Sequence, residues 1–299
     1  RSQAPLYLST MKWGFVPFIL FSMFVHGQNQ RFSKVSGYPG SGPWEPFVKL
    51  SSAHMGPNAL PIPPLRWGAF RMRNEVDLTL NSFFASSDFT LNPEFRIQYT
   101  PLGGRMAFEI QWIPVEWFHY SESIRDDRNT WENRTTGVVM GDLNLHTMIQ
   151  VLTESSTRPG ILMTAGVKIP TGQGLEFSRN TQALGYHLDL SVGKDLIVGS
   201  GTLRPFAMAG WNSYQTYSLP AVDQGPLYGL GMRYGWKKHQ FNLGFRGYHG
   251  NIGNGDSPMI LETGYRWTHD NLTLLVELGY GIQDFPFTYL KLGWRYGFL

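Results

Sequence analysis

Ionisable residues of opposite sign are segregated along this sequence, in a spacing that could select charged molecules. Among residues that alternate with apolar neighbours, the early ones are acidic apart from Arg96, and the later ones are mainly basic. The early acids are Glu75, Asp77, Glu94, Glu109 and Asp142. The later group is Arg204, Arg233, Arg246, Arg266, Lys291 and Arg295, with the acids Glu262 and Glu277 among them. Walls of opposite sign around a narrow pore would orient dipolar solutes and disfavour apolar ones.

A second interpretation of these charges is equally open. If the chain closes into a ring, its first and last strands must pair with each other. Glu75 and Asp77 could then simply neutralise Lys291 and Arg295. In that case the charges would hold the interior together rather than select a solute.

Four further residues of the same series have catalytic or ligand chemistry, namely His146, Lys168, His187 and Asp189. No spacing pairs a nucleophile with a base, and a histidine in a polar interior is more often a hydrogen-bonding residue. Residues 250–256 have the composition of a calcium loop but lack its ordered oxygen ligands and closing glutamate. We therefore predict no catalytic residue, metal or cofactor, and keep a lipid hydrolase as the less favoured alternative.

The elements that must position these residues are strands, and the last forty residues show the pattern clearly. Apolar Leu272, Leu274, Val276, Leu278, Tyr280 and Ile282 alternate with Thr273, Glu277, Gly279 and Gly281. A period of two places the two kinds on opposite faces of a sheet. A face of aliphatic and aromatic residues backed by glycine and isolated charges is typical of a transmembrane β-barrel.

Twelve candidate strands continue this pattern after Ala69. They span residues 69–85, 88–100, 104–118, 136–153, 160–170, 184–197, 202–212, 226–237, 239–249, 258–269, 271–283 and 286–299. Short connections follow the even strands, and long ones follow most odd strands. Short periplasmic turns that alternate with longer external loops are a rule of outer-membrane barrels. The sequence thus predicts an all-β, antiparallel up-and-down barrel of about twelve strands. The strand that contains Pro205 is the weakest of the set.

Aromatic residues near strand ends predict two interfacial girdles. One girdle would contain Trp112, Trp117, Phe118 and Tyr120, and the other Trp236, Trp267, Trp294, Tyr296 and Phe298.

The N-terminus has the pattern of a secretory signal peptide. Lys12 precedes an apolar run from Trp13 to Val25, and we place cleavage near Gly27, so that residues 1–27 are upstream sequence and signal. Without Arg1 and Lys12, the 25 basic residues fall to 23 against 22 acids, a net charge of +1, and no basic stripe indicates a nucleic-acid partner. The absence of cysteine excludes disulfides and cysteine metal sites.

Residues 28–68 form a Pro/Gly-rich segment that precedes the predicted barrel at 69–299. Its seven prolines follow no period, and proline cannot donate to a strand ladder. The composition favours a partly ordered leader. It leaves open that the segment folds into the barrel as a plug.

The chain resembles Gram-negative outer-membrane β-barrel proteins, and the signal followed by Gln28-Asn29-Gln30 resembles those of Bacteroidetes exported proteins. Residues 166–172, followed by 185–190, are similar to a strand–loop–strand signature of the phenol-degradation MetA-pathway channel family. That resemblance implies an outer-membrane transporter of small, often aromatic molecules. One departure is that Leu299, rather than an aromatic residue, ends the chain.

Together these observations predict a bacterial outer-membrane channel in contact with lipid, through which small solutes move passively. The alternative is an accessory barrel with a plugged lumen in an envelope complex. Neither the solute nor the oligomeric state follows from the sequence.

Overall fold

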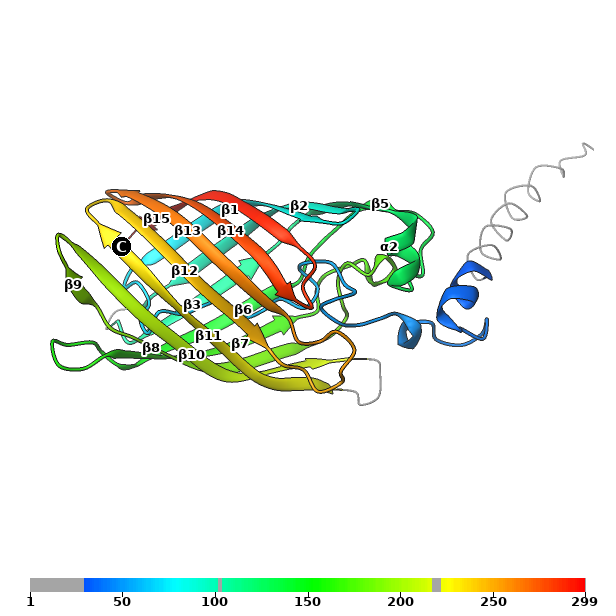
Figure 1. Ribbon diagram of the computed structural model, residues 1–299, viewed down its shortest axis with the longest axis horizontal. Coiled ribbons are helices and arrows are strands. Elements are labelled where there is room, and N and C mark those ends of the chain that lie inside the picture. Colours follow the sequence, from blue (N-terminus) through cyan, green and yellow to red (C-terminus); the bar gives the residue numbers. More distant parts are fainter. Residues whose placement is uncertain (1–29, 102–103, 217–221, 299) are drawn as a thin grey trace, which may run out of the picture.

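The alternation of apolar and polar residues produces one continuous antiparallel sheet that closes on itself (Figure 1). The first strand, β1 (Asn74–Ala85), pairs with β2 (Asp88–Tyr99) on one side and with the last strand, β15 (Thr288–Phe298), on the other. This seam completes the ring. The prediction of an all-β antiparallel barrel is confirmed.

The computed structural model describes residues 30–101, 104–216 and 222–298. The predicted signal peptide, its cleavage near Gly27 and Leu299 lie outside these residues. The remaining strands are β3 (Met106–Trp112), β4 (Glu116–Tyr120), β5 (Thr136–Val139), β6 (Leu143–Leu152), β7 (Gly160–Ile169), β8 (Gly185–Gly193), β9 (Leu196–Val198), β10 (Gly201–Gln215), β11 (Val222–Trp236), β12 (His239–Tyr248), β13 (Met259–His269) and β14 (Leu272–Gln283).

These strand segments make up the twelve wall strands that the sequence predicts. β2 pairs with β4 over residues 88–91 and with β3 over residues 95–99, so β3 and β4 lie end to end in one wall strand. β5 pairs with β4, and β6 pairs with β3, so β5 and β6 form the next wall strand in the same way. The short β9 extends the wall by pairing with the start of β10.

The two interruptions were not expected, since 104–118 and 136–153 were predicted as continuous strands. Pro114 lies in the first break and has no N–H to donate to a ladder. The backbone N–H of Gly141 donates to the carbonyl of Ile113 at 2.9 Å, so the two breaks lie beside each other. Proline is tolerated inside β10 for a related reason: Pro205 lies between the residues that pair with β9 and those that pair with β8.

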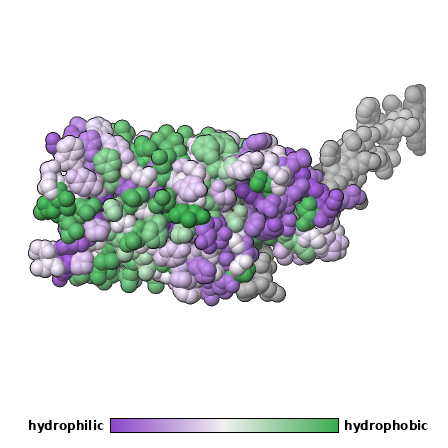
Figure 2. Space-filling model, in the orientation of Figure 1, coloured by the Kyte–Doolittle hydropathy of each residue, from purple (hydrophilic) through white to green (hydrophobic). Residues whose placement is uncertain are grey.

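The wall has an apolar outer face and a polar inner face. All six alternating residues from Leu272 to Ile282 are exposed on the outside, and Figure 2 shows hydrophobic residues over much of the wall. Polar and charged residues alternate with them and are buried on the inside. Phe118 and Tyr120 are an exception to the predicted girdle, because they are 3% and 0% exposed and pack inside against Phe177.

The two ends of the barrel differ. The loop end carries α2 (Glu122–Asp127) and η2 (Leu175–Phe177) in its long connections, whereas the turn end carries the short connections and the C-terminal end of β15 (Figure 1). Hydrophilic residues gather at the end that carries α2 (Figure 2). Among the described residues, no helix is long and apolar enough to cross a membrane.

The chain that precedes β1 runs from the loop end to the turn end. Residues 30–36 are helical and η1 (Glu45–Phe47) follows, both lying beyond the loop end of the barrel in Figure 1. There, Trp131 of the β4–β5 loop packs against Phe32 and stacks on Trp44. The next residues, 51–73, enter the barrel, and we call them the lumen segment.

The lumen segment has partners at successive depths. Ser52 hydrogen-bonds the Tyr248 hydroxyl near the loop end, and Arg246 donates to the carbonyl of Pro63 at 3.0 Å further in. Near the turn end, Gln98 donates to the carbonyl of Arg71 at 2.8 Å. Apolar side chains of this part of the chain join inward-facing residues of the wall in one cluster: Val48, Leu50, Met55, Leu60 and Ile62 with Phe83, Tyr214, Leu227, Tyr248 and Tyr289. The first strand consequently begins at Asn74 rather than near Ala69.

Candidate lumen site

The barrel encloses a cavity of about 640 Å³ between the wall and the lumen segment. Every predicted lumen residue except Asp142 and Asp189 lines this cavity. The charged residues of the alternating series therefore lie mainly around one cavity. Their pairing determines what the cavity could bind.

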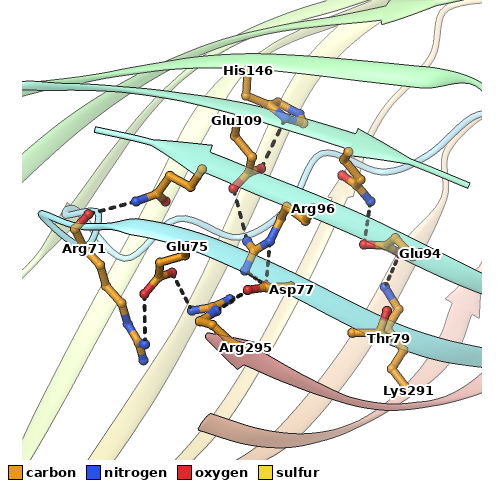
Figure 3. A network of polar contacts seen from close by, with 12 residues as sticks. Arg71, Glu75, Asp77, Thr79, Glu94, Arg96, Glu109, His146, Lys291 and Arg295 are labelled. Atoms are coloured by element: carbon orange, nitrogen blue, oxygen red, sulfur yellow. Dashed lines mark hydrogen bonds and ion pairs between the residues drawn. The ribbon is translucent and has the colours of Figure 1, made fainter. Parts of the chain in front are cut away.

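One network of ion pairs crosses the seam between β1 and β15 (Figure 3). Asp77 accepts hydrogen bonds from Arg295 Nε and Nη2 at 2.7 and 2.8 Å, and from Arg96 Nε at 2.8 Å. Arg295 also lies 3.2 Å from Glu75, which contacts Arg71 at 3.2 Å and Arg73 at 3.0 Å. Because these groups are largely buried, each charge depends on its partners for stabilisation.

The same network continues around the wall through Glu109. This carboxylate is paired with Arg66 of the lumen segment at 2.9 Å and with Arg96 at 3.1 Å. His146 Nδ1 approaches it at 3.3 Å, as Figure 3 shows. Arg96, the lone base in the predicted acidic group, therefore connects Asp77 to Glu109.

The proposed neutralisation of Glu75 and Asp77 is found for Arg295 but not for Lys291. Lys291 instead lies 3.7 Å from Glu94, which also accepts hydrogen bonds from Asn81 and Gln111.

A second network lies on the strands that follow β15 around the ring, with members on β12, β13, β14 and β15 itself. Arg246 is paired with Glu262 at 2.9 Å, and the Tyr289 hydroxyl lies 3.2 Å from both Glu262 and Glu277. Acidic and basic residues are thus mixed within each network, whereas one of the two interpretations of the sequence placed them on separate walls.

Two buried basic residues, Lys168 and Arg179, anchor the long loops near the loop end through ion pairs. Lys168 is 2.6 Å from Asp142 and also donates to Thr181 in the β7–β8 loop. Arg179 of the same loop is 0% exposed and pairs with Glu116 at 2.8 Å and with Asp88 at 3.4 Å. Burial alone would lower the pKa of Arg179, but Glu116 and Asp88 raise it, so the guanidinium stays charged.

His187 and Asp189 lie side by side on β8, with His187 Nε2 3.6 Å from the Asp189 carboxylate. His187 also lies near His146, with ring centroids 5.4 Å apart. Ser191 is engaged elsewhere, because its hydroxyl accepts the N–H of Gly68 at 3.2 Å. Ser191 is therefore not paired with His187 as a nucleophile with its base, and no group of three metal-binding side chains occurs among the described residues.

Three predicted residues gather at the turn end around an unpredicted one. Arg204 is paired with Glu154 at 2.6 Å and with Asp195 at 2.7 Å, and it donates to the carbonyl of Trp67 at 2.7 Å. Arg233 and Arg266 both have their guanidinium carbon 4.5 Å from the centre of the Trp67 ring.

The charged lumen residues that sequence reasoning missed come from outside the wall strands. Arg66, Trp67 and Arg71 belong to the lumen segment, and Glu154 and Asp195 belong to turns. One signal was available: the stretch from 66 to 73 contains three arginines and no acid, which is unusual for a chain that is only 16% charged. Such a basic stretch next to strands rich in acidic residues indicates contact between them.

Comparison with known proteins gives a likeness in structure alone. No protein-family model matches the chain, and no curated protein matches it. The chain is similar to the crystal structure of an outer membrane channel from Pseudomonas putida F1, with a TM-score of 0.57, 12% identity, and coverage of 80% of this chain and 100% of that one.

Two other solved structures are less similar. The KdgM porin in complex with disordered oligogalacturonate has a TM-score of 0.46 and 9% identity, covering 75% of this chain and 99% of that one. The CymD monoaromatic hydrocarbon channel has a TM-score of 0.40 and 7% identity, covering 77% and 89%. The likeness in fold rests on the outer membrane channel from Pseudomonas putida F1. The finer resemblance to the phenol-degradation channel family stays a prediction.

Proposed function

We propose that this protein is a bacterial outer-membrane channel through which small solutes move passively, and that its lumen charges set the preference among them. The observation that carries the proposal is a cavity of about 640 Å³, lined by charges of both signs, inside a closed barrel. Such an interior is costly to maintain unless it serves water or polar solutes. A packed apolar core would stabilise a purely structural barrel better.

The outer face supports a location in lipid. Leu278, Tyr280 and Ile282 are 50%, 61% and 51% exposed, and similar residues recur around the wall. Soluble proteins rarely expose apolar surface continuously on this scale. Closure of the sheet through β1 and β15 pairs the wall strands on both sides, as the bilayer requires, and among the described strands the short β5 and β9 have a partner on one side.

The experiment is reconstitution of the purified protein. We expect discrete conductance steps in planar bilayers and uptake of small solutes by liposomes. A folded barrel, recognised by a shift in gel migration on boiling, that gives neither conductance nor uptake contradicts the proposal. The small aromatic solutes implied by the family resemblance belong in the liposome assay, since their transport stays a prediction.

A second candidate function is an accessory barrel whose lumen is plugged, and the contacts of the lumen segment favour it. The segment fills much of the interior between Ser52 and Arg71. Deletion of residues 28–66 separates the two functions. If the wild type does not conduct and the deletion variant does, the segment is a plug. If both conduct to a similar extent, the open path does not depend on the segment.

A further inference from the structure

We propose that Arg233 and Arg266, held against the indole of Trp67 at the turn end of the lumen, form a binding site for small organic carboxylates. This names the solute class of the proposed channel, and so its role in transport rests on the proposed function. The site itself can be tested by binding alone.

The platform of the site is rigid. The carbonyl of Trp67 accepts a hydrogen bond from Arg204, and the neighbouring Gly68 is held on both sides of its peptide. Its N–H donates to Ser191 at 3.2 Å, and its carbonyl accepts from Gln150 at 2.8 Å. Both guanidinium groups lie 4.5 Å from the centre of the indole ring, within range of a cation–π interaction. The two positively charged groups, Arg233 and Arg266, therefore lie within about twice 4.5 Å of each other.

The three arginines of this cluster carry more positive charge than the two carboxylates within 4.0 Å of them carry negative charge. Arg204 and Arg233 together face Glu154 and Asp195, although Asp195 lies 2.7 Å from Arg204 and 3.8 Å from Arg233. Within the described part of the chain, Arg266 has no carboxylate within 4.0 Å.

Among the carboxylates that act on Arg266, Glu277 has the largest electrostatic effect, and Glu277 also accepts a hydrogen bond from the Tyr289 hydroxyl. The Nη1 atom of Arg266 is buried and has no hydrogen-bond partner. An orphaned charged donor of this kind indicates that a ligand or solvent completes the site.

The excess of about one positive charge fits a monovalent carboxylate better than a divalent phosphate. Guanidinium groups present paired donors that match the planar carboxylate, and Arg233 and Arg266 both line the lumen cavity. The carboxylate would replace the missing counter-charge of Arg266. The remainder of the solute would extend into the cavity.

Equilibrium dialysis of the full-length protein in detergent, with radiolabelled benzoate as the ligand, tests the site. We expect the wild type to bind benzoate, and Arg266→Gln to bind it about tenfold more weakly or worse, since a charged hydrogen bond is lost. Trp67→Leu should weaken binding as well, because it removes the platform. Arg158→Gln, which removes the same charge from an exposed turn at the same end, should bind as the wild type does.

Benzyl alcohol serves as a neutral competitor of similar size, and gel migration shows that each variant is folded. The site is overturned if the wild type does not bind benzoate, if Arg266→Gln binds it equally well, or if benzyl alcohol competes as well as unlabelled benzoate. A second readout is the anion-to-cation permeability ratio in bilayers, which Arg266→Gln should lower. Binding without conductance would refute the channel and keep the site, whereas conductance without binding would refute the site alone.

Discussion

At the scale of single residues, Asp77 joins three neighbouring wall strands. It lies on β1 and accepts hydrogen bonds from Arg96 of β2 and Arg295 of β15. The carboxylate is 6% exposed, so neither arginine can exchange it readily for water. One side chain thus stabilises both sides of the strand at which the barrel closes.

We expect Asp77→Asn to destabilise the barrel by about 1.5–3 kcal/mol, since it weakens the charged hydrogen bonds to two arginines that each keep one other carboxylate. Urea unfolding in lipid vesicles, followed by tryptophan fluorescence, measures this loss. Asp270→Asn is the matched control, because the Asp270 side chain is 84% exposed in a turn and should change stability little. Equal unfolding midpoints for the two variants would show that the network is solvated and energetically unimportant.

The inward position of Asp77 followed from the period of two, but its partners did not. Alternation fixes which face a residue occupies, whereas the ion pairs depend on the register between strands and on chains that arrive from elsewhere. Arg96 appeared as an exception in an acidic group and is in fact the link between Asp77 and Glu109. Arg66 and Arg71 could not be assigned because no periodicity places the lumen segment relative to the wall.

At the scale of elements, the lumen segment lies close to the wall where the wall carries glycine. A Cβ atom built on Gly193 would lie 2.3 Å from the carbonyl oxygen of Trp67, and one on Gly160 would lie 2.7 Å from that of Gly68. Gly68 itself has a φ of +74°, which favours glycine. The backbone of the segment therefore contacts the backbone of β7 and β8 directly.

We expect Gly193→Val to displace the lumen segment near Trp67, because backbone cannot move aside as a flexible side chain would. If the segment narrows the pore, the single-channel conductance should rise. Gly235→Ala is the control, since its Cβ would meet only an oxygen at 3.9 Å. Unchanged conductance and unchanged protease resistance of the segment in Gly193→Val would contradict the close packing described here.

The strands themselves were largely predictable from sequence, and their interruptions were not. Alternation and loop length predicted the twelve wall strands, because every wall strand must be apolar on one face. The breaks near Pro114 and Gly141 arise because one strand lacks a donor and its neighbour accommodates the gap. Pro114 was visible in the sequence, but Pro205 shows that a proline alone does not end a strand.

At the scale of the whole molecule, the exposed apolar wall requires an apolar environment. We expect Leu278→Lys, near the middle of β14, to reduce stability in vesicles by about 2–4 kcal/mol if this face contacts lipid. Ile197→Lys is the control, because Ile197 is 88% exposed on the short β9 at the turn end. A surface that faces water would tolerate both substitutions equally, and that result would contradict a location of the barrel in the membrane.

The path of the chain also predicts an orientation. With the short turns on the periplasmic side, residue 34 lies outside the cell, although it precedes the whole barrel. The chain contains no cysteine, so a single Lys34→Cys substitution is a clean reporter. A membrane-impermeant maleimide should label Lys34→Cys in intact cells and leave Lys238→Cys, in a turn at the other end, unlabelled. Labelling of Lys238→Cys and not of Lys34→Cys would show that the barrel has the opposite orientation in the membrane.

The lumen segment directly precedes β1, and β1 is the strand whose pairing with β15 closes the ring. Because the pairing of β1 with β15 closes the wall around the lumen segment, the segment cannot leave the lumen sideways. The aromatic cluster of Phe32, Trp44 and Trp131 beyond the loop end would resist withdrawal of the lumen segment along the barrel axis. We therefore expect the lumen segment to take its place inside the sheet before β1 pairs with β15 during folding.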